Sequence, residues 1–111
     1  MLPRLVLLLF VLAAGPLWAA TAQESFSAAR EAYDARDEVA LAAYSSRLYQ
    51  ENYPLAPYVD YWRMLLRLDR AEAPEVREFL ARHAELPFAE RVRVEWLKKL
   101  GRRQDWKTFF E

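Results

Sequence analysis

The chain has 111 residues, with 16 basic and 16 acidic side chains, one histidine and no cysteine. This length allows a single domain, and the absence of cysteine excludes a disulfide scaffold and a thiolate metal site. The balanced charge argues against a protein that binds nucleic acid by neutralising phosphates. An apolar share of 54% is too high for an intrinsically disordered chain.

Residues 1–22 have the pattern of a secretory signal peptide. Arg4 provides a positive charge, and the stretch Leu5–Ala14 is an unbroken apolar run of ten residues. A helix of that length covers about 15 Å, roughly half of a bilayer core, which suits a signal peptide. Small residues predict cleavage after Ala22, with cleavage after Ala20 as the second candidate and an uncleaved anchor as the alternative. No cysteine is present to accept a lipid, so we expect a free periplasmic product.

The mature chain, residues 23–111, has apolar residues at helical spacing and no alternating run typical of a strand. The pattern predicts an all-α fold, in which short antiparallel hairpins stack as an α-superhelix or solenoid. Breaks are expected at the prolines, because proline lacks a backbone donor and disfavours a helical residue before it. The expected helices are Phe26–Arg36 with Ser25 as cap, Glu38–Gln50, Pro57–Leu68, and three that open at Pro74, Pro87 and Trp106. Four side chains are expected to be largely buried between them: Trp62, Phe79, Leu80 and Trp96.

Three predicted turns resemble one another. They are Ala35-Arg36-Asp37, Leu68-Asp69-Arg70 and Arg103-Gln104-Asp105. Their aspartates lie 32 and 36 residues apart, near the period of two-helix repeats. The last apolar turn, which contains Trp106 and Phe110, would have no later helix to pack on. We therefore expect that the natural polypeptide continues past Glu111, or that another chain covers this end.

No residue pattern indicates a catalytic centre, a cofactor site or a metal site. Glu24 and Ser25 are interpreted as part of a helix N-terminus. His83 is interpreted as a helix-end or packing residue, because no second histidine is present to share a metal with it. The acidic residues Glu72, Glu75 and Glu78 are interpreted as a solvated helix face.

Aromatic residues crowd the segment 49–62, which contains Tyr49, Tyr53, Tyr58, Tyr61 and Trp62. Rings at helical spacing usually pack between helices, so the core is the first interpretation. The alternative is a platform formed by Tyr53, Tyr58 and Tyr61, on whose faces sugar rings would stack.

The segment Tyr53-Pro-Leu-Ala-Pro-Tyr58-Val-Asp-Tyr61 resembles the Tyr-Pro-Leu-x-Pro-Tyr-x-x-Tyr signature in the N-terminal helical domain of soluble lytic murein transglycosylases. The resemblance covers residues 26–111. Its later parts are Val76-x-x-Phe79-Leu80, Leu86-Pro87, Trp96-Leu97-x-x-Leu100 and Arg103-x-Asp105-Trp106.

The resemblance implies an α-superhelical scaffold that precedes a lysozyme-like catalytic domain. In that family the catalytic domain cleaves the MurNAc–GlcNAc bond of peptidoglycan without water and leaves a 1,6-anhydro sugar. No residue here matches the catalytic motif, so we expect this stretch to be non-catalytic. The expected partners are peptidoglycan glycan strands, bound through the full-length enzyme, together with further C-terminal helices and the catalytic domain. The alternative is a stand-alone periplasmic helical-repeat adaptor that binds a protein through residues 106–111.

Overall fold

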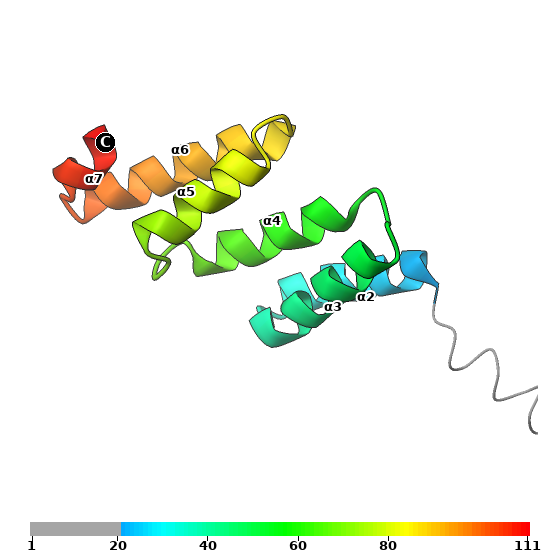
Figure 1. The fold of residues 1–111 in the computed structure, drawn as a ribbon. Coiled ribbons are helices and arrows are strands. Elements are labelled where there is room, and N and C mark those ends of the chain that lie inside the picture. Colours follow the sequence, from blue (N-terminus) through cyan, green and yellow to red (C-terminus); the bar gives the residue numbers. More distant parts are fainter. Residues whose placement is uncertain (1–20) are drawn as a thin grey trace, which may run out of the picture.

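The computed structural model describes residues 21–111, and these form six α-helices and no β-strand (Figure 1). The all-α class is thus confirmed for the described part of the chain. The predicted leader lies outside it, apart from its last two residues. The helices are α2 (Ala22–Asp34), α3 (Glu38–Gln50), α4 (Ala56–Arg67), α5 (Ala73–Arg82), α6 (Pro87–Arg102) and α7 (Trp106–Phe110).

Helices α3 to α7 begin within one residue of the predicted positions, because strong local signals set their starts. The carboxylate of Asp37 accepts a hydrogen bond of 3.1 Å from the Ala40 amide at the start of α3. Asp105 accepts one of 3.2 Å from the Thr108 amide at the start of α7. Such caps satisfy amides that have no partner within the helix. Helices α4, α5 and α6 each have proline in the first turn, where its missing N–H costs nothing.

The start predicted for the first helix is wrong. Helix α2 begins at Ala22 rather than Phe26, and its cap is Thr21, whose hydroxyl accepts a hydrogen bond of 3.1 Å from the Glu24 amide. Ser25, the predicted cap, lies inside the helix and is buried. The error arose because Thr21, which is an equally good cap, was assigned to the leader.

Two of the three similar turns share one backbone geometry. After α2, Arg36 takes a left-handed conformation with φ of 57°, and after α6 Gln104 does so with φ of 59°. In both turns the amide of the following aspartate bonds to the carbonyl oxygen five residues earlier, at 2.8 and 2.9 Å. This closure is a Schellman motif, which ends a helix and satisfies its last carbonyls.

The predicted equivalence of the middle turn is wrong. The turn Leu68-Asp69-Arg70 has no left-handed residue, and α5 has no side-chain cap. Asp69 instead forms an ion pair with Lys99 of α6, and this hydrogen-bonded cation holds the pKa of the Asp69 carboxyl below its usual value. A long-range contact has replaced the local capping role.

Helix α4 packs on two sides because it carries two apolar faces. On one face the ring of Trp62 lies 5.1 Å from that of Phe26 and 6.0 Å from that of Tyr33, both in α2. On the other face Tyr61 stacks on Phe88 of α6, with centroids 4.7 Å apart and planes within 8°. Aromatic contacts of this kind contribute about 0.5–1.5 kcal/mol beyond area burial.

Arg67, at the end of α4, joins three helices. Its guanidinium binds both carboxylate oxygens of Glu75 in α5, at 2.8 and 3.1 Å, and reaches Glu38 of α3 at 3.3 Å. At the start of α4, Asp60 contacts His83 directly after α5. Because opposite ends of the two helices meet, α4 and α5 run antiparallel. Polar contacts at both ends, from Arg67 to Glu75 and from Asp60 to Arg82 and His83, hold them together.

The buried positions agree largely with the predicted core. Trp62, Phe79 and Trp96 are 7%, 1% and 5% exposed, which confirms them. Leu80 is only partly buried, so that prediction was too strong. It lies at the edge of α5, where it lines a shallow surface hollow.

Replacing Trp96 by alanine should lower the free energy of unfolding by about 3–5 kcal/mol, because a buried ring would leave a cavity. Trp106→Ala is the matched control, since the same side chain is removed from a residue that is 50% exposed; it should cost less than half as much. Urea denaturation followed by circular dichroism measures both. Equal losses in the two variants would show that Trp96 is not a core residue.

Candidate functional site

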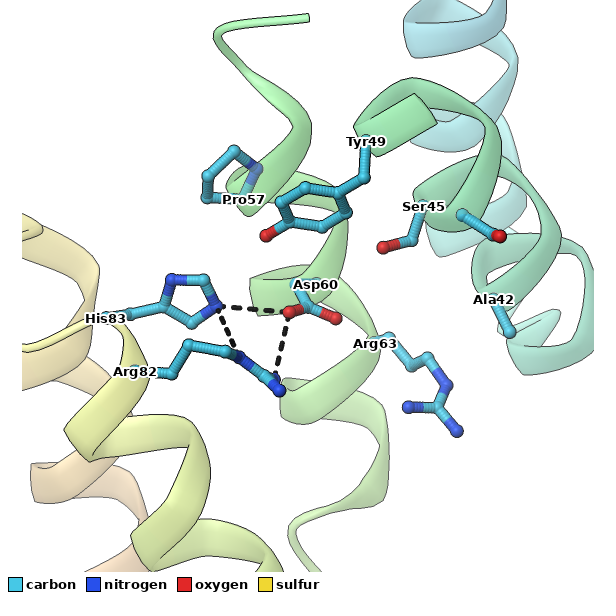
Figure 2. A pocket seen from close by; sticks show the side chains of 9 residues that line it. Ala42, Ser45, Tyr49, Pro57, Asp60, Arg63, Arg82 and His83 are labelled. Carbon is cyan, nitrogen blue, oxygen red and sulfur yellow. Dashed lines mark hydrogen bonds and ion pairs between the residues drawn. The ribbon is translucent and has the colours of Figure 1, made fainter. Parts of the chain in front are cut away.

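A hollow of about 620 Å³ lies where α3, α4 and the end of α5 meet (Figure 2). Helix α3 contributes one wall, α4 the floor, and the C-terminal end of α5 the opposite wall. The lining is rich in hydroxyl and charged groups. Its polar residues are Ser45, Ser46, Tyr49, Asp60, Arg63, Arg82 and His83.

Asp60 is the centre of a hydrogen-bonded group in this hollow. Its Oδ2 lies 3.1 Å from Nε2 of His83 and 3.1 Å from Nη2 of Arg82. A carboxylate only accepts hydrogen bonds, so Nε2 carries the hydrogen in the contact with His83. Arg82 Nε also lies 3.4 Å from that nitrogen. This second contact is not a simultaneous hydrogen bond, because Nε2 then has no lone pair to offer.

His83 owes its position to packing. It is the C-cap of α5, and its ring makes edge-on contacts with Phe79 at 4.8 Å and Phe88 at 5.5 Å. The side chain is 5% exposed. The predicted role as a helix-end and packing residue is confirmed, and the hydrogen bond to Asp60 is added to it. Within residues 21–111, no group of histidine, cysteine or acidic side chains is placed to hold a metal ion.

Arg63 brings a second cation to the hollow. It lies three residues after Asp60 on α4 and is partly buried. Its Nε is fully covered and has no hydrogen-bond partner, and its guanidinium forms no ion pair with any residue of the described chain. Figure 2 shows it apart from the three residues that the dashed lines join. A partly buried cation without a counter-charge favours binding of an anion.

Tyr49 and Ser45 add hydroxyl groups and an open aromatic face. Tyr49 is 42% exposed, whereas Ser45 is 7% exposed. In Figure 2 the hydroxyl of Ser45 points into the space between Tyr49 and Asp60. Burial and the negative charge of Asp60 raise the pKa of Tyr49, so its phenol keeps its proton and can donate. The arrangement is suited to binding a ligand that carries hydroxyl groups and a negative charge.

The tyrosines predicted as a sugar platform do not gather on one exposed face. Tyr58 and Tyr61 both contact Phe88 of α6, with centroids 5.2 and 4.7 Å away, and Tyr53 packs against Phe26 of α2 at 5.6 Å. Tyr61 is 9% exposed, and the other two are partly buried against the core. The structure thus places Tyr61 between helices. Sugar stacking on Tyr53 and Tyr58 stays a prediction.

Sequence reasoning missed the hollow because its residues are distant in the chain. Asp60 and His83 are 23 residues apart, and no spacing rule joins them. One signal was available on α3. Leu41 and Leu48 are fully buried there, and Tyr49 follows Leu48 by about 100° around the helix, which places it at the edge of the buried face.

Comparison with protein-family models, curated proteins and solved structures gives no match. None of the helices formed by residues 21–111 is long and apolar enough to cross a membrane.

Asp60→Ala should lower the free energy of unfolding by about 1–3 kcal/mol, because it leaves the buried donor of His83 without a partner. Asp34→Ala is the control: Asp34 pairs with Arg30 on the surface of α2, with 68% of its side chain exposed. That substitution should cost less than about 0.5 kcal/mol. Urea denaturation compares the two variants. If Asp60→Ala cost no more than the control, Asp60 would not hold α4 and α5 together.

Proposed function

We propose that this chain is a non-catalytic, α-superhelical scaffold from the N-terminal part of a periplasmic lytic transglycosylase, an enzyme that cleaves the MurNAc–GlcNAc bond of peptidoglycan to 1,6-anhydro products. The proposal starts from the sequence resemblance over residues 26–111. The observation that carries it is the structural role of the segment 53–61, which supplies that resemblance.

The segment 53–61 forms the corner between α3 and α4 and the start of the central helix. Helix α3 is closed by the left-handed Asn52, with φ of 54°, and by the Tyr53 amide, which bonds to the Leu48 carbonyl oxygen at 2.9 Å. Pro57 then lies in the first turn of α4. The tyrosines of the segment contact two different neighbours, with Tyr53 against α2 and both Tyr58 and Tyr61 against α6. A signature with these roles serves the architecture rather than chemistry. This supports a scaffold as the common property of the chains that carry the signature.

The superhelix is part of the same proposal. The α2–α3 and α6–α7 turns have the same geometry, and their capping residues, Asp37 and Asp105, differ by 68 in residue number (105 − 37). That separation is two periods of a two-helix repeat of about 34 residues. Trp106 and Phe110 of α7 are 50% and 79% exposed. In a superhelix this apolar surface would receive the next hairpin.

Export to the periplasm through a cleavable leader belongs to this proposal as well. Helix α2 begins at Ala22 and is capped by Thr21. Cleavage after Ala20, the second predicted site, keeps this cap. Cleavage after Ala22, the first predicted site, removes the cap and the first helical residue.

A periplasmic adaptor is the second candidate function, and the exposed rings of α7 favour it. Trp106 and Phe110 contact each other and Phe109 at centroid distances of 5.0 to 6.4 Å, so they form one continuous apolar patch. In an adaptor this patch would bind a protein partner.

The purified protein should co-sediment with peptidoglycan sacculi and release no anhydro-muropeptides from them. Binding is expected because the hollow offers hydroxyl, carboxylate and guanidinium groups to a glycan. Centrifugation followed by gel analysis of the pellet measures binding, and mass spectrometry of the supernatant detects cleavage. Release of anhydro-muropeptides would contradict the non-catalytic role. Protein that stays in the supernatant would contradict a scaffold that binds peptidoglycan and would favour the adaptor.

A further inference from the structure

We propose that the hollow between α3, α4 and α5 binds an acidic saccharide, with the ligand carboxylate on Arg63 and the sugar ring against Tyr49. The site itself stands on the geometry of the hollow. The inference rests on the proposed scaffold function only for the natural source of the ligand, which would be the acidic amino sugar of peptidoglycan.

The charge of the ligand follows from the contrast between Arg63 and the arginines near it. Arg82 pairs with Asp60 in the same hollow, and Arg67, one turn further along α4, pairs with Glu75. Arg63 has no such partner among residues 21–111. Its buried Nε is out of reach, so a ligand meets the terminal Nη groups. A guanidinium binds a carboxylate through charge-assisted hydrogen bonds.

The Asp60 carboxylate does not exclude an anionic ligand, because its charge is already balanced. Arg82 binds Oδ2 of Asp60 at 3.1 Å, and His83 donates to the same oxygen. The polar lining then has two arginines against one carboxylate, which leaves a net positive charge at Arg63. The Tyr49 phenol also shares a hydrogen bond with this carboxylate, so Asp60 is satisfied by groups of the chain itself.

Tyr49 and Ser45, two of the other groups that line the hollow, indicate that the acidic ligand is a saccharide. Tyr49 is 42% exposed as a residue, and the C–H groups of a sugar can pack on the negative face of its ring. Ser45 and Tyr49 both line the hollow, so their hydroxyls lie beside the space that a sugar on the Tyr49 ring would occupy (Figure 2). The Ser45 hydroxyl can donate to and accept from sugar hydroxyls, and the Tyr49 phenol, whose hydrogen is directed to Asp60, can accept from them. The volume of about 620 Å³ is within the usual range for a small-ligand site.

The test is a titration of this chain with three free sugars, followed by two-dimensional NMR of its backbone amides. N-acetylmuramic acid and N-acetylglucosamine form the main pair, because they differ only in the lactyl ether that carries the carboxylate. The acid should bind at least roughly tenfold more tightly. Its largest shifts should fall on residues of the hollow, around Ser45, Tyr49 and Arg63. Glucuronic acid is the third sugar and supplies a carboxylate on a different ring.

Two variants separate the carboxylate contact from the ring contact. Arg63→Gln should abolish the preference for the acid, so that both amino sugars bind to within about twofold. Arg93→Gln is the matched control, because Arg93 is an exposed arginine on α6 that pairs with Glu90 away from the hollow; it should keep the preference. Tyr49→Ala should weaken both sugars by a similar factor. Circular dichroism confirms that each variant is folded.

Equal binding of the two amino sugars, or a preference that survives Arg63→Gln, would overturn the inference. Tighter binding of the dipeptide D-alanyl-D-alanine than of either acidic sugar would also overturn it, because Arg63 would then serve a peptide carboxylate. Binding of glucuronic acid without N-acetylmuramic acid supports the acidic-saccharide site and removes peptidoglycan as the source. If no acid binds, this inference fails, while the scaffold function is decided separately by the sacculus assay.

Discussion

The rings of Tyr61 and Trp62 hold the two sides of this fold on one helix. Neighbouring residues of an α-helix point about 100° apart, so the two side chains of α4 reach different neighbours. Trp62 lies against α2, and Tyr61 stacks on Phe88 of α6. Helix α5 is then fixed to α4 by Arg67 with Glu75 at one end and by Asp60 at the other. The relative placement of α3, α4 and α5 depends on this central helix.

The hollow combines groups that hold helices with groups that are open to a ligand. Asp60, Arg82 and His83 join α4 to the end of α5 through hydrogen bonds. Arg63 on the α4 wall takes no part in that contact. Tyr49 on the α3 wall lies next to Asp60, whose charge and hydrogen bond raise the pKa of its phenol in addition to burial. Because Asp60 thus contacts groups from the α3 wall and from the end of α5, Arg63 and the ring of Tyr49 are held in place before a ligand arrives. Such preorganisation lowers the entropic cost of binding.

Much of the fold could be predicted from the sequence, because proline and aspartate mark most helix starts. Asp37 and Asp105 cap the helices that the spacing indicated. The errors arose where a local signal had two possible uses. Asp69 resembles a cap but pairs with Lys99 thirty residues away. The exposed ring of the aromatic segment belongs to Tyr49 rather than to the tyrosines of the signature, since only the packing of α2 and α6 decides which rings are covered.

Native-state hydrogen exchange in increasing urea tests the central role of α4 most directly. If α4 joins both sides of the fold, the slowest amides of α3, α4 and α6 should converge on one opening free energy, equal to that of global unfolding. Trp62→Ala should then lower the protection of α6 as much as that of α3. Separate opening free energies for α2–α3 and for α5–α7, with α6 unchanged in Trp62→Ala, would contradict the account.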